Sequence, residues 1–176
     1  MQARGLLDGL ESRVSRGVIG GLFAGLVFLL ANMAFATSQD MPAVAPMLDI
    51  STIFNLTEKP EVTPENISVG LVTHLTLSAL FGVAFALVVP LLRGPRAVLL
   101  AALAFGIGLY LVNFQILGRV FFEWFQEGPN QLFELFIHAV YGLLLVPFFA
   151  SALERVETAH ARRTPAPLGA TARSAA

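Results

Sequence analysis

Residues 17–39 read GVIGGLFAGLVFLLANMAFATSQ and contain no Asp, Glu, Lys or Arg. An α-helix needs about 20 mainly apolar residues to cross the hydrocarbon core of a bilayer. Three further uncharged stretches follow, at residues 66–92, 97–118 and 135–153. The sequence therefore predicts an all-α membrane protein, a bundle of four transmembrane helices over about residues 17–37, 66–92, 97–117 and 132–153.

The composition agrees with a single membrane domain. Of the 176 residues, 56% are hydrophobic and only 13% are charged, whereas soluble domains carry about 25% charged residues. The chain has no cysteine, which excludes disulfides, thiolate metal sites and cysteine nucleophiles. Hydrolase, phosphate-loop and zincin motifs are absent from the sequence. We expect a protein that is not an enzyme, whose partner is the lipid bilayer and not a nucleic acid.

Basic residues are unevenly distributed over the predicted loops, and the side that carries more of them normally faces the cytoplasm. Lys59 and Arg119 fall on one side, in loops 38–65 and 118–131. The other nine basic residues fall on the opposite side: Arg4, Arg13, Arg16, Arg93, Arg96, Arg155, Arg162, Arg163 and Arg173. This predicts that both termini are cytoplasmic, with a cytoplasmic segment at 1–16 and a disordered tail at 155–176.

The first apolar stretch also has features of a secretory signal peptide. Arg13 and Arg16 precede it, and Ala34-Phe35-Ala36 resembles a cleavage site. However, the run is longer than the roughly 7–15 apolar residues of a signal peptide. An uncleaved first helix is therefore favoured, with cleavage as the alternative.

Both outer loops have the composition of membrane-surface segments. Residues 49–54, with prolines on either side, suggest a short amphipathic helix lying on the membrane. The second loop interleaves aromatic and charged residues around Trp124, as is typical of the membrane interface.

Polar landmarks suggest an internal repeat. Gly25 precedes Asn32 by seven residues in the first stretch, and Gly106 precedes Asn113 by seven in the third. This spacing predicts two helical hairpins, duplicated in parallel about an axis along the membrane normal.

The second and fourth stretches support the same repeat. A proline opens each predicted helix, and a histidine follows at a similar distance: Pro64 precedes His74, and Pro129 precedes His138. The two histidines are expected to approach one another across the repeat axis.

The repeat places several polar side chains at a similar depth in the outer leaflet, and helical spacing adds neighbours on the same faces. The candidate ligand or cofactor residues are Asn32, His74, Ser78, Tyr110, Asn113, Glu134, His138 and Tyr141.

Three interpretations of this cluster remain open. Interhelical hydrogen bonds would specify the packing of the bundle without any ligand. Alternatively, His74 and His138 bind a haem, or bind a transition metal together with Glu134, because neutral imidazoles ligate both. In the third interpretation an oligomeric transporter or proton relay uses Glu134, His138, His74 and Tyr141. Against transport, helix breaks are limited to Pro90 and Pro147.

Small residues recur at four-residue spacing in the first and third stretches, as in closely packed membrane helices. They are Gly17, Gly21, Gly25, Ala102, Gly106 and Gly108. We expect them to pack the first span against the third within one subunit; a homo-oligomer or docking onto a larger membrane complex is the alternative.

The chain resembles small uncharacterised bacterial inner-membrane proteins of the YagU-like kind between residue 17 and about residue 152. The residues that carry this resemblance are Asn32-Met33, His74, Gly82, Phe85, His138 and Tyr141-Gly142. It implies an inner-membrane location and supplies no activity or binding residues. The sequence therefore predicts a noncatalytic scaffold or accessory subunit, with cofactor binding as the alternative.

Overall fold

The structure is a computed structural model that describes residues 2–55 and 60–149. Within these residues every regular element is a helix. The α-helices are α1 (Gln2–Ser38), α2 (Ala45–Asn55), α3 (Pro64–Val88), α4 (Pro95–Tyr110), α5 (Arg119–Phe121), α6 (Trp124–Glu127) and α7 (Gln131–Leu145). Short 3₁₀ turns η1 (Val89–Leu91) and η3 (Val146–Phe149) extend α3 and α7, and a π-helix η2 (Leu111–Gly118) extends α4.

Four helical stretches are long and apolar enough to cross a membrane: Gly9–Ser38, Pro64–Leu91, Pro95–Phe121 and Gln131–Phe149. The four predicted helices are thus confirmed in number and approximate position. Helix α1 begins at Gln2 and so includes nearly all of the predicted N-terminal segment 1–16. The predicted tail at 155–176 lies outside the described residues.

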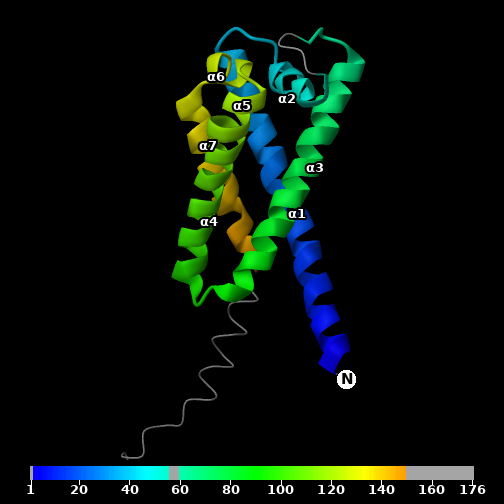
Figure 1. The fold of residues 1–176 in the computed structure, drawn as a ribbon, viewed down its shortest axis with the longest axis vertical. Coiled ribbons are helices and arrows are strands. Elements are labelled where there is room, and N and C mark those ends of the chain that lie inside the picture. The colour runs from blue at the N-terminus through cyan, green and yellow to red at the C-terminus, as the bar shows by residue number, and fades with distance from the viewer. Residues whose placement is uncertain (1, 56–59, 150–176) are drawn as a thin grey trace, which may run out of the picture.

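The four long helices form two hairpins. Helix α1 packs chiefly on α3, and α4 packs chiefly on α7. The hairpins meet where α1 contacts α7, and in Figure 1 α3 and α4 diverge from the turn that joins them. Helices α1 and α7 therefore form the junction of the two hairpins.

Glycines allow the two helices of each hairpin to touch backbone to backbone. A Cβ atom on Gly21 would overlap the carbonyl oxygen of Ser78 in α3, and one on Gly106 would overlap that of His138 in α7. The expected packing of the first span on the third is therefore wrong: Gly17, Gly21 and Gly25 lie against α3, while Ala102 and Gly106 lie against α7. Spacing identified the close contacts but not the partner, because any neighbouring helix can use a small-residue face.

Gly108 takes no part in these contacts. A Cβ placed on Gly108 would have open space around it. Apart from the neighbouring residues and nearby backbone of its own helix, no atom of the described residues lies within 4 Å of that position. It lies two positions from Gly106, which turns it away from α7.

The two helices with histidines begin differently. Thr63 caps α3 by accepting a hydrogen bond from the Asn66 backbone N–H at 3.2 Å, and Pro64 is the first helical residue, as predicted. Pro129 was expected to lie in the first turn of α7, but it lies before the helix. Asn130 intervenes as the cap and accepts from the Phe133 N–H at 3.0 Å, so the helix begins at Gln131.

The end of the bundle that contains α2, α5 and α6 is here called the capped end, and the opposite end, where η1 joins α4, is called the turn end. An apolar core fills the half near the turn end, around Phe85, Val98, Leu145 and Phe149. At the capped end, Trp124 Nε1 donates to Thr52 Oγ1 at 3.0 Å and joins α6 to α2. The predicted short helix at residues 49–54 is present within α2.

Asp49 of α2 lies at the capped end, outside the four long helices. Neighbouring groups partly desolvate its carboxyl and raise its pKa to about 6, although the residue as a whole stays exposed.

Candidate functional site

A polar cluster lies between the two hairpins in the half of the bundle near the capped end. It consists of His74 and Ser78 on α3 and of Glu134, His138 and Tyr141 on α7. All five residues are buried. Their spacings of three and four residues place them along one face of each helix, as predicted.

His74 joins α3 to α1. Its Nε2–H donates a 2.8 Å hydrogen bond to the Gly25 carbonyl oxygen, which requires the proton on Nε2 because a carbonyl only accepts. Gly25 makes this contact possible, since a Cβ at that position would overlap the Ser78 side chain.

Tyr141 joins the two hairpins directly. Its hydroxyl donates to the Ser78 carbonyl oxygen at 2.7 Å, across 63 residues of sequence. Tyr141 is almost completely buried, with 4% of its surface exposed. The bond therefore lies inside the bundle, where a lost partner is not replaced by water.

His138 is held by its own helix. Its Nδ1–H donates to the Glu134 backbone carbonyl at 2.7 Å, and the Glu134 carboxylate oxygen Oε2 lies 3.6 Å from the same nitrogen. Both side chains are buried. Glu134 and His138 thus lie on the same face of α7, as their four-residue spacing predicted.

Phe28 of α1 lies against both histidines. Its ring centroid is 5.6 Å from that of His74, in a stacked arrangement, and 4.8 Å from that of His138, edge to face. The two imidazoles therefore lie in the same region of the bundle, and an aromatic ring contacts both. Sequence reasoning missed Phe28 because nothing in its local pattern separates it from other apolar residues of the first span.

The three-ligand metal site of the alternative interpretation, His74 and His138 with Glu134, is not formed. In the part of the chain that the structure describes, no three His, Asp or Glu side chains are placed to hold a metal ion. His74 Nε2 and His138 Nδ1 donate to carbonyl oxygens, so the nitrogens left to act as ligands are His74 Nδ1 and His138 Nε2, and Phe28 packs on both rings. The spacing placed these side chains on suitable faces but could not show what lies between them.

The other candidates are placed at the edge of this cluster. Asn32 is buried and donates to the Phe28 carbonyl oxygen of its own helix at 3.2 Å. Asn113 is half-buried, and Phe114 takes the buried position, with its ring 5.5 Å from that of His138. Tyr110 is buried, with its ring 6.0 Å from that of His138.

A second polar network, which the sequence did not suggest, surrounds the π-helix η2. Gln115 Nε2 donates to Tyr110 Oη at 2.7 Å and to Gln131 Oε1 at 3.2 Å. Arg119 donates to Gln115 Oε1 through Nε and Nη2 at 3.1 and 2.8 Å. Glutamine side chains inside an apolar run were the available signal.

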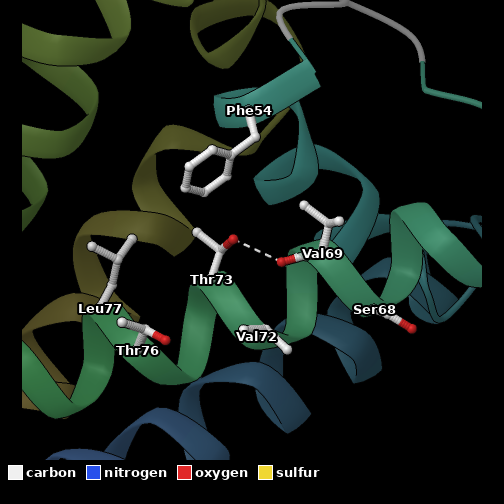
Figure 2. Close-up of a pocket in the computed structure, with 7 residues that line it drawn as sticks. All are labelled: Phe54, Ser68, Val69, Val72, Thr73, Thr76 and Leu77. Carbon is white, nitrogen blue, oxygen red and sulfur yellow. Dashed lines mark hydrogen bonds between the residues drawn. The ribbon is translucent and has the colours of Figure 1, made fainter.

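Two surface hollows lie away from the polar cluster. Figure 2 shows one of about 450 Å³, where Phe54 projects from α2 toward the face of α3 that carries Thr73 and Leu77. The other, of about 330 Å³, lies between α1 and α3 around Leu22 and Ala79. Neither hollow is lined by a residue of the polar cluster, and both are mainly apolar.

Compared with known proteins, the chain matches no protein-family model, no curated protein and no solved structure. The resemblance to YagU-like proteins therefore stays a prediction.

Proposed function

We propose that this chain is a multi-pass protein of the bacterial inner membrane that acts as a noncatalytic scaffold or accessory subunit. Large apolar side chains are exposed on all four long helices, among them Leu26, Leu80, Leu100 and Phe136. Exposed apolar surface of this extent supports contact with lipid or with other membrane helices.

In the proposed orientation, both termini lie in the cytoplasm. Arg93 and Arg96 lie at the turn end, and Arg4, Arg13 and Arg16 lie in the N-terminal half of α1. An excess of arginine on one side favours a cytoplasmic position for that side. The capped end then faces away from the cytoplasm.

The proposed role of the polar cluster is to hold the bundle together. The observation that carries this proposal is that two of its side chains donate to backbone carbonyls of other helices, His74 to Gly25 and Tyr141 to Ser78, while His138 donates to Glu134 within its own helix. In the described residues, no buried side-chain nitrogen or oxygen lacks a hydrogen-bond partner. Side-chain bonds to the backbone of another helix are suited to positioning helices, since each such bond contributes roughly 0.6–2 kcal/mol.

We also propose that the two hairpins arose by duplication. In each one, a glycine of the first helix lies against the histidine-bearing part of the second: Gly25 against His74 and Ser78, and Gly106 against His138. These are the glycines and histidines that the sequence repeat aligned. The correspondence supports the duplication.

The proposal is tested on the full-length protein purified in mild detergent, as wild type, His74→Ala and His138→Ala. We expect no metal in stoichiometric amount and no bis-histidyl absorption spectrum with added hemin in any of the three, and lower thermal stability in both variants. A bis-histidyl spectrum in the wild type that both substitutions abolish would contradict the scaffold role and support haem binding.

A transport function is tested separately. Proton flux into liposomes is compared for the wild type, Glu134→Gln and His138→Ala. The scaffold role predicts equal, background flux for all three proteins. Flux in the wild type that either variant abolishes would contradict it.

A further inference from the structure

The third long helix changes its hydrogen-bonding pattern at Leu111, and through Gly118 it is a π-helix. In a π-helix each N–H reaches back five residues, whereas in an α-helix it reaches back four. The π form is rare and occurs frequently at functional sites. The sequence of the segment, LVNFQILG, contains no proline and no glycine before Gly118. The backbone alone therefore does not require the π form.

Two side-chain interactions hold this form. Gln115 Nε2 donates to Tyr110 Oη at 2.7 Å, and the five-residue separation of this pair suits the wider π turn. From outside the helix, Gln126 Nε2 of α6 donates to the Phe114 carbonyl oxygen at 2.6 Å. Both bonds depend on the π register, because an α-helical register would rotate Phe114 and Gln115 away from these positions.

The two registers place different residues on His138. In the observed register Phe114 is buried and its ring packs edge to face on the imidazole, while Asn113 is half-buried. If the segment were α-helical, each residue beyond Leu111 would turn further about the axis, by about half a position at residues 113 and 114 and by about one position after a full turn, near residue 117. Phe114 would then turn away from the imidazole of His138, and Asn113 would turn toward it with a carboxamide, which can hydrogen-bond an imidazole.

We propose that this segment is a two-state register switch, in which the capped end selects whether Phe114 packs on His138 or turns away and lets Asn113 approach it. The connection to the loops is direct: Gln126 lies in α6, and Trp124 of the same helix is bonded to Thr52 of α2. A displacement of α6 removes the bond to the Phe114 carbonyl and releases the segment to the α register. The polar environment of His138 thereby responds to the position of the outer loops.

The test uses the absence of cysteine from the chain. Single cysteines at Asn113, Ile116 and Leu117 carry nitroxide spin labels, and the access of oxygen to each label is measured by electron paramagnetic resonance in lipid nanodiscs. In the observed register Ile116 and Leu117 are 55% and 40% exposed. In the α register, residue 117 takes the buried direction of Gly118 and residue 113 turns toward the buried direction of Phe114, while residue 116 stays exposed.

The measurement is made in the wild-type background and in Gln126→Leu, Tyr110→Phe and the control Gln39→Leu, whose side chain bonds only to Ser38 among the described residues. Gln126→Leu and Tyr110→Phe are expected to lower oxygen access at positions 113 and 117 and to leave position 116 unchanged; Gln39→Leu changes none.

Unchanged access at positions 113 and 117 in both variants would overturn the switch, as would an α-helical pattern in the wild type that no variant alters. Tyr110→Phe removes a single oxygen atom, so it keeps the test decisive if Gln126→Leu does not fold.

Discussion

At the scale of single residues, polar side chains of the bundle donate hydrogen bonds to backbone carbonyl oxygens of neighbouring turns and helices. His74 and Tyr141 each bond to a helix other than their own, at Gly25 and at Ser78. Such bonds tie separate helices together, because breaking one would leave a polar group without a partner in an apolar interior. His138 differs in that its bond to the Glu134 carbonyl remains within α7.

The bond between the hairpins can be removed with little other change. Tyr141→Phe eliminates the hydroxyl that donates to the Ser78 carbonyl and keeps the ring. We expect the free energy of unfolding to fall by about 1 kcal/mol, the usual net value of one hydrogen bond. Unfolding in mixed detergent micelles by increasing dodecyl sulfate measures this difference.

Thr37→Val is the matched control. The Thr37 hydroxyl donates at 2.8 Å to Ala34 of its own helix and is exposed. Its removal should alter stability much less than Tyr141→Phe does. Equal effects of the two substitutions would show that the Tyr141 bond does not join the hairpins energetically.

At the scale of the helices, small residues decide which faces touch. Gly21 meets Ser78 and Gly82, and Gly106 meets His138, so the backbones of each pair approach to a distance that a β-carbon would not allow. Close approach increases van der Waals contact, which replaces the hydrophobic effect as the source of helix association in a bilayer. The π-helix shows a second property of a helix that local composition does not reveal, and its Phe114 carbonyl accepts a bond from Gln126 of another element.

Two glycines of α4 allow a controlled test of the close contact. In Gly106→Ala the new methyl group would overlap the His138 carbonyl oxygen, so the hairpin must separate, and we expect a loss of roughly 1–3 kcal/mol, typical of overpacking. Gly108→Ala adds the same methyl group where the described residues leave open space, and should stabilise the helix by about 0.5–1 kcal/mol. Thermal unfolding in detergent compares the two. A loss of the same size in both variants would contradict the assigned packing.

At the scale of the whole molecule, the bundle has an apolar half and a polar half. Phe85, Val98, Leu145 and Phe149 pack near the turn end, whereas the histidines and Tyr141 lie toward the capped end. Helices α2 and α6 are joined at the capped end by the bond from Trp124 to Thr52. Helices α2 and α6 therefore lie together at the end of the molecule nearer the polar half.

The proposed orientation is tested with single cysteines, because the chain has none of its own. Gln39→Cys near the capped end should react with a membrane-impermeant maleimide in intact spheroplasts. Pro95→Cys at the turn end should react only after the membrane is opened. The reverse pattern would mean that the termini face outward, against the arginine distribution.

The sequence by itself determined the number and approximate limits of the four long helices and the short helix at 49–54, because both follow from the length and pattern of apolar runs. It also indicated that His74, Ser78, Glu134, His138 and Tyr141 share a buried site, because helical spacing and the cost of burying polar groups depend only on local order.

Only the tertiary structure decided which helices pair and what lies between the polar groups. The glycines of α1 meet α3 and not α4, Phe28 contacts both histidines, and Phe114 takes the position expected for Asn113. These features depend on contacts between residues far apart in the chain. A face of small residues can pack against any neighbouring helix, so local spacing does not reveal which helices pair. The π-helical segment accepts a side-chain bond from α6, and local spacing does not reveal this contact either.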